Sequence, residues 1–179
     1  DMRIYKLLQD EPFFAILSRQ LNKVASNSIP TAGIRFNKDD ACYEMIYNPR
    51  FLAGLIKELP INGFEQQKWV LMHELYHASL GHCTGRTLPD YDRKLANCAM
   101  DLAINSLTNM HPTAPDWVLM PGRGDFRFLE GAMEMASEWY ANEIVRKQDN
   151  NPDKDMSGGE GQFDDHDDFE PSEGETESA

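Results

Sequence analysis

Residues 62–82 read NGFEQQKWVLMHELYHASLGH, and this stretch decides the organisation of the chain. Asn62 and Glu65 have the spacing of a helix capping box, and neither Gly nor Pro interrupts the run from Phe64 to Leu80. Glycine is common just past the last turn of a helix. We therefore expect a helix that begins after Asn62 and ends at Gly81.

An HExxH motif, His73-Glu74-Leu75-Tyr76-His77, lies inside this helix. Positions four apart on a helix differ by about 40°, so both imidazoles project from one face and can hold one metal ion. Glu74, about 100° round from His73, can reach a water on that ion without ligating it. Zinc brings the pKa of such a water towards about 7, and a neighbouring carboxylate accepts its proton as it attacks a carbonyl. The motif predicts hydrolysis with Zn²⁺ as cofactor, His73 and His77 as ligands and Glu74 as general base.

Two histidines leave zinc short of a protein ligand, and the residues offer two candidates for the third. His82 would point about 140° away from His77 in a continuing helix, so only the break at Gly81 could bring it back. Asp101 lies in a later apolar segment, where Asn97, Asp101 and Asn105 recur every fourth residue as a polar stripe. If that helix packs antiparallel against the first, Asp101 faces the histidines, with the two asparagines as supporting donors.

The rest of residues 1–147 carries mainly helical signals. Helical spacing of apolar residues predicts further helices over about residues 11–26, 49–59, 89–107 and 129–147. Alternation around Ile34 and Phe36, and along Cys42–Tyr47, predicts a β-hairpin, whose strands are the only ones that we expect. Residues 109–126 are rich in Pro and Gly and should form an irregular loop. The predicted fold class is therefore α+β, mostly helical with a small antiparallel hairpin or sheet.

The charge of the chain is concentrated at its C-terminal end. Residues 148–179 contain twelve acidic residues and one lysine, which is -11 of the net charge of -13. We expect a domain over residues 1–147 and a disordered acidic tail over 148–179, through which a partner protein could be recruited. A chain with this charge lacks the basic face that nucleic-acid binding requires.

The sequence also bears on the compartment. No apolar run approaches the roughly 20 residues of a membrane helix, and the N-terminal stretch has acids where a signal peptide is apolar. Cys42, Cys83 and Cys98 are odd in number and lack CxxC spacing, so neither a disulfide framework nor a cysteine zinc site is indicated. We expect no membrane association and a cytoplasmic location with reduced thiols.

Two segments together resemble a known family. HELYHASLGH at 73–82 and NCAMDLAIN at 97–105, with a hairpin and an Asn-Pro helix upstream, resemble the metallopeptidase domain that precedes a von Willebrand A-like domain in many bacterial and phage proteins. The resemblance covers about residues 30–147, and more broadly extends to gluzincin-type zincins. The chain ends where the von Willebrand A-like domain would begin, so we expect a fragment or a stand-alone version. The resemblance implies a zincin-like fold with zinc ligands His73, His77 and Asp101 and general base Glu74.

Zincins commonly lay an extended substrate beside an edge strand, for which we expect Cys42–Tyr47. A donor to the oxyanion is also required, and the sequence leaves five candidates open, namely Tyr76, Tyr91, His111, Arg123 and Tyr140.

We therefore predict a zinc-dependent peptidase that acts on a protein or peptide substrate. Two alternatives stay open, a non-catalytic interaction module that holds a structural ion and a hydrolase of a non-peptide amide. Glu74→Gln separates peptidase from module, since it should abolish hydrolysis in the first and have little effect in the second.

Overall fold

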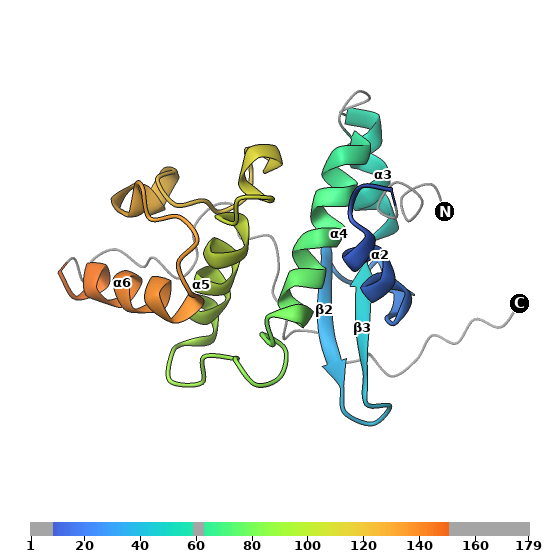
Figure 1. Ribbon diagram of the computed structural model, residues 1–179, viewed down its shortest axis with the longest axis horizontal. Coiled ribbons are helices and arrows are strands. Elements are labelled where there is room, and N and C mark those ends of the chain that lie inside the picture. Colours follow the sequence, from blue (N-terminus) through green and yellow to red (C-terminus); the bar gives the residue numbers. More distant parts are fainter. Residues whose placement is uncertain (1–8, 59–62, 151–179) are drawn as a thin grey trace, which may run out of the picture.

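The computed structural model describes residues 9–58 and 63–150, which form an α+β structure. Its elements are, in chain order, α2 (Pro12–Arg19), β1 (Asn22–Ala25), β2 (Ala32–Asn37), β3 (Cys42–Tyr47), α3 (Pro49–Glu58), α4 (Gly63–Ser79), α5 (Arg93–Asn105), the 3-10 helices η1 (His111–Thr113) and η2 (Gly124–Leu129), and α6 (Ser137–Asp149). Helix α4 lies between the sheet on one side and α5 with α6 on the other (Figure 1). The face of α4 turned towards α5 is therefore enclosed.

Helix α4 is the predicted central helix, and it ends as the sequence indicates. Gly81 has φ +76°, a left-handed conformation that glycine adopts without strain. The Gly81 amide donates to the carbonyl of Ala78 (3.2 Å) and the His82 amide to that of His77 (2.9 Å). This is the Schellman pattern of a helix C-terminus. The predicted cap at Asn62 lies outside the described residues.

The predicted hairpin is confirmed, but the sheet is larger and mixed. Strands β2 and β3 pair antiparallel, with Ile34 opposite Met45. Strand β1 adds on the other side of β3, parallel to it, so the strand order is β1-β3-β2. The prediction of a purely antiparallel sheet is therefore wrong. So is the prediction that β3 is an edge strand, since the edges of this sheet are β1 and β2.

Strand β1 occupies a segment that we expected to be helical. Helix α2 ends at Arg19, and Asn22–Ala25 pairs with β3, placing Val24 opposite Ile46. All four residues of β1 have exposed side chains. The strand therefore lacks the alternation of buried and exposed residues that would mark it in the sequence. The backbone hydrogen bonds offered by β3 decide the conformation here, a tertiary effect that local propensity does not reveal.

Two other helices are shorter than predicted at their N-termini. Helix α5 begins at Arg93 rather than near Pro89, because the Asp92 carboxylate accepts hydrogen bonds from the amides of Lys94 (3.0 Å) and Leu95 (3.4 Å) and so caps it there.

Helix α6 begins at Ser137 rather than near Leu129 and continues to Asp149. Gly131 and Glu134 have φ values of +80° and +57°, which no α-helix accommodates. Helix α3, by contrast, begins as predicted, with the Asn48 side chain accepting from the Arg50 amide at 2.9 Å.

Two hydrophobic clusters hold the elements together. One joins the sheet to α4 through residues such as Ile34 and Leu75, and the other joins α5 to α6 through residues such as Leu102 and Ile144. Among residues 9–58 and 63–150, no helix is long and apolar enough to cross a bilayer. The three cysteines form no disulfide within this part of the chain. The acidic tail was predicted over residues 148–179, but Gln148 and Asp149 belong to α6, and residues 151–179 lie outside the described residues.

Candidate metal centre

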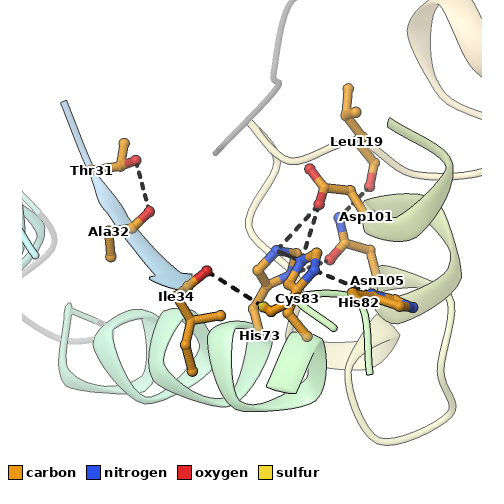
Figure 2. Close-up of polar contacts among 10 residues, drawn as sticks. Thr31, Ala32, Ile34, His73, His82, Cys83, Asp101, Asn105 and Leu119 are labelled. Atoms are coloured by element: carbon orange, nitrogen blue, oxygen red, sulfur yellow. Dashed lines mark hydrogen bonds and ion pairs between the residues drawn. The ribbon is translucent and has the colours of Figure 1, made fainter. Parts of the chain in front are cut away.

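Helices α4 and α5 bring the three predicted metal ligands together. The Nε2 atoms of His73 and His77 lie 3.1 Å apart, and Asp101 Oδ1 lies 3.5 Å from the first and 3.3 Å from the second. All three side chains are buried, with exposed fractions of 0–1%. Figure 2 shows the Asp101 carboxylate of α5 facing the imidazoles of α4. The antiparallel packing expected for these helices thus produces one compact group of ligand atoms.

The size of this group fits a tetrahedral metal ion. Ligands at about 2.0–2.1 Å from zinc in a tetrahedron lie about 3.3–3.4 Å from one another. The three separations of 3.1, 3.3 and 3.5 Å match that edge length. The donor set of two imidazoles and one carboxylate is also one that catalytic zinc sites use. The spacing of the residues present therefore fits such an ion.

The charge of Asp101 provides a second argument for a cation. Both carboxylate oxygens are buried, and neither accepts a hydrogen bond of normal geometry from any residue that the structure describes. Burial raises the pKa of Asp101, but the contacts with His73 and His77 outweigh it and hold the pKa well below its usual range. These contacts lower the pKa only while the imidazoles are charged. With neutral imidazoles, the form that binds a metal, the buried carboxylate requires a cation as its compensating charge.

Asn105 fixes the tautomer of His73. Its Nδ2 donates to the carbonyl of Leu119 at 2.8 Å, so Oδ1 is the atom that faces His73 Nδ1 at 2.9 Å. An amide oxygen only accepts, so Nδ1 carries the proton and Nε2 is the nitrogen able to bind a metal. Asn105 thus supports the site as an acceptor rather than as the donor we expected.

The other asparagine of the stripe behaves differently. Asn97 is 5% exposed, and its Nδ2 finds no hydrogen-bond partner within the described part of the chain. The structure does not show the supporting donor role expected for it.

His82 lies behind His77 and away from the ligand atoms. The turn at Gly81 brings its ring back, as the sequence argument required, but its Nδ1 lies 3.2 Å from His77 Nδ1. That nitrogen is on the opposite side of the ring from Nε2, which faces His73 and Asp101. The geometry therefore favours Asp101 over His82 as the third ligand, with His82 positioned to orient His77.

Glu74 follows His73 on α4 and is fully buried, with an exposed fraction of 0%.

Trp69, one turn before His73, stacks on the His73 ring with centroids 5.3 Å apart and donates from Nε1 to the Met110 carbonyl at 3.1 Å. The sequence analysis missed this contact, although a tryptophan four residues before a ligand on the same helix is a signal that could have indicated it.

A second group of candidate ligands lies on the hairpin, where Asp40, Cys42 and Glu44 approach one another. Its charges are already compensated. Glu44 accepts from Asn37 Nδ2 at 3.0 Å and pairs with Arg35 at 2.7 Å, and these contacts lower the pKa of Glu44. This group is therefore a polar network of the hairpin, and it needs no ion.

The five candidate oxyanion donors occupy different places. Tyr91 lines a cavity beside the metal centre. Tyr76 accepts a hydrogen bond from Asn109, and Tyr140 is buried against Ser106 in the α5–α6 cluster. His111 and Arg123 are at the surface of the loop after α5. The Tyr91 hydroxyl also has a partner, since it donates to Asn142 Oδ1 at 2.9 Å, so the structure singles out none of the five as the oxyanion donor.

Fold and site together define an α+β protein with a buried two-histidine, one-carboxylate group and a buried glutamate directly after the first histidine on α4. The chain belongs to the family described as "Putative metallopeptidase domain", which it matches over residues 2–179. No curated protein and no solved structure gives a match. Family membership carries the coarse assignment to metal-dependent proteases, and the geometry makes His73, His77 and Asp101 candidate ligands.

Proposed function

We propose that this protein is a zincin-like peptidase that holds Zn²⁺ with His73, His77 and Asp101 and uses Glu74 as its general base. The observation that carries the proposal is the triangle of ligand atoms with sides of 3.1, 3.3 and 3.5 Å, together with the buried Glu74 that follows His73 on α4. A structural zinc site normally has four protein ligands, whereas a catalytic one has three and keeps a position for water or substrate. The three-residue group therefore supports a catalytic centre.

Each residue has a distinct task in the proposed reaction. The zinc ion, when bound, acts as a Lewis acid that makes water a better nucleophile and polarises the scissile carbonyl. Glu74 accepts a proton from the attacking water at its carboxylate and passes it to the leaving amine. Asn105 keeps His73 in the metal-binding tautomer, and His82 orients the ring of His77.

The sheet offers a place for the substrate backbone. Strand β2 is an edge strand, and Ile34, Arg35 and Phe36 of this strand line the cavity beside the metal centre. An extended peptide could add to this edge through main-chain hydrogen bonds. We therefore assign to β2 the role that the sequence analysis gave to β3.

The test of this function is hydrolysis of a quenched-fluorescent peptide mixture by the zinc-loaded protein, by the chelated protein and after zinc is returned. We expect chelation to abolish cleavage and zinc to restore it, because no residue replaces the Lewis acid. Cleavage that survives complete removal of metal would contradict a metallopeptidase.

Asn105→Ala should weaken zinc binding about 10-fold to 100-fold, as loss of a hydrogen bond behind a metal-bound histidine commonly does. The variant removes the acceptor that keeps the proton of His73 on Nδ1. The dissociation constant would be measured by competition with a chromophoric chelator. Asn97→Ala is the matched control, since Asn97 belongs to the same buried stripe of α5 but makes no hydrogen bond through Nδ2 to the described residues. Equal affinities in the two variants would contradict the role of Asn105.

A further inference from the structure

A cavity of about 410 Å³ adjoins the metal centre. Its walls come from β2, from the segment between α4 and α5, and from the first turns of α5. His82 lines the cavity and also contacts His77 at 3.2 Å, so one imidazole ring separates the cavity from the metal ligands. On α5, the cavity is lined by Asn97 and Met100. Asn97 precedes Asp101 by four residues, so the two lie on the same side of the helix. A side chain bound here would therefore belong to a residue close to the scissile bond.

The walls of this cavity are basic. Arg35, Lys38 and Arg93 line it, and none of the described residues that line it is acidic. Residues 148–179 carry -11 of the net charge of -13, so the rest of the chain is close to neutral and the basic lining is a local feature of this cavity. Lys38 follows β2 and Arg93 begins α5, so the positive charges come from two opposite walls.

One of the three cations is paired with a carboxylate outside the cavity wall, and the other two are exposed. Arg35 pairs with Glu44 at 2.7 Å, a carboxylate that is not on the cavity wall. Lys38 and Arg93 have exposed side chains, so they meet a ligand where it enters. The described residues that line the cavity thus carry positive and no negative charge, and clefts lined by one sign of charge concentrate ligands of the opposite sign.

We propose that this cavity is a specificity pocket that receives an acidic side chain of the peptide, so that the protein prefers Glu- or Asp-containing substrates. Apolar wall residues such as Ile34 and Leu88 contact the aliphatic part of that side chain, and Lys38 and Arg93 attract its carboxylate. The inference rests on the proposed function, because a specificity pocket presupposes a peptide substrate. Binding of peptides to the pocket can nevertheless be measured without any hydrolysis.

The test uses zinc-loaded Glu74→Gln protein and fluorescent heptapeptide mixtures with both termini blocked, identical except for a central Glu, Gln or Lys. Blocked termini ensure that only the side chain supplies a carboxylate. Ion pairs at exposed positions contribute modestly, so we expect about a 10-fold tighter dissociation constant for the Glu mixture than for the Gln mixture. The preference should disappear at about 1 M salt, where the screening length is only about 3 Å.

Charge reversals on this background identify the pocket. Arg93→Glu and Lys38→Glu should each remove the preference for Glu and favour the Lys mixture. Lys94→Glu is the matched control, because Lys94 is the exposed neighbour of Arg93 on α5 and does not line the cavity. It should leave the order of affinities unchanged although the net charge changes equally.

Failure of the pocket and failure of the proposed function give different results. Equal binding of the Glu and Gln mixtures, no binding of the Glu mixture, or an unchanged preference in Arg93→Glu and Lys38→Glu overturns the pocket, even if the wild-type protein cleaves peptides. A Glu preference lost in these variants supports the pocket, even if the wild-type protein cleaves none of the mixtures and the peptidase assignment fails.

Discussion

Replacing Glu74 by Gln should reduce peptide hydrolysis by about 10²-fold to 10⁴-fold, the range associated with loss of general acid–base catalysis. The amide has almost the same shape as the carboxylate, but it cannot accept a proton from water. Glu74 is buried on α4 and does not belong to the group of three ligand residues. The Glu74→Gln variant should therefore keep its zinc content and its fold. Initial rates on the peptide mixture, zinc content and circular dichroism would be measured on the same preparations.

The matched control for this variant is Glu65→Gln, the same substitution in the first turn of the same helix. It should leave the rate unchanged. A Glu74→Gln protein that keeps zinc, fold and the full rate would contradict the general base. Zinc bound by the wild-type protein with no hydrolysis of any peptide would favour the interaction module instead.

Replacing Asp101 by Ala should remove the metal. We expect about one zinc per wild-type chain and almost none in Asp101→Ala after dialysis, since two imidazoles alone leave zinc without its third protein ligand. Zinc should also raise the melting temperature of the wild-type protein, because a ligand present at about 100 times its dissociation constant stabilises by about 2.7 kcal/mol. Elemental analysis and thermal unfolding with and without zinc would measure both effects.

Asp116→Ala is a suitable control for this experiment, since Asp116 is a fully exposed aspartate of the loop after α5. It should keep the zinc and the thermal shift. His82→Ala should also keep zinc, with weaker affinity, because His82 Nδ1 approaches the Nδ1 of His77 and not the Nε2 that faces Asp101. Zinc retained by Asp101→Ala and lost by His82→Ala would make His82 the third ligand.

Local signals in the sequence were sufficient to predict the helix that carries the site. The HExxH spacing, the uninterrupted run to Leu80 and the glycine that follows act within a few turns, and α4 ends as they indicate. The polar stripe on α5 led to Asp101 because its period of four on an apolar segment is also a local pattern. The hairpin and the start of α3 were also predicted correctly from local patterns.

The starts of α5 and α6 were misplaced because of local caps and turns, whereas the other errors depend on contacts between distant segments. Strand β1 exists because β3 offers it a parallel partner, and this pairing turned the expected edge strand into the central one. Whether His82 faces the ligand atoms or the outer side of His77 depends on how far the turn at Gly81 rotates the chain. The basic cavity is likewise formed by β2, a loop and α5, which are separate in the sequence.

X-ray absorption at the zinc edge of the loaded protein tests the central claim most directly, because it counts and identifies the atoms around the metal. The account predicts only nitrogen and oxygen neighbours at about 2.0–2.1 Å, with the outer-shell signal of two imidazoles. It predicts that Asp101→Ala, if it retains any zinc, loses an oxygen neighbour and no imidazole. A sulfur neighbour at about 2.3 Å, or the signal of a third imidazole, would contradict a site made by His73, His77 and Asp101.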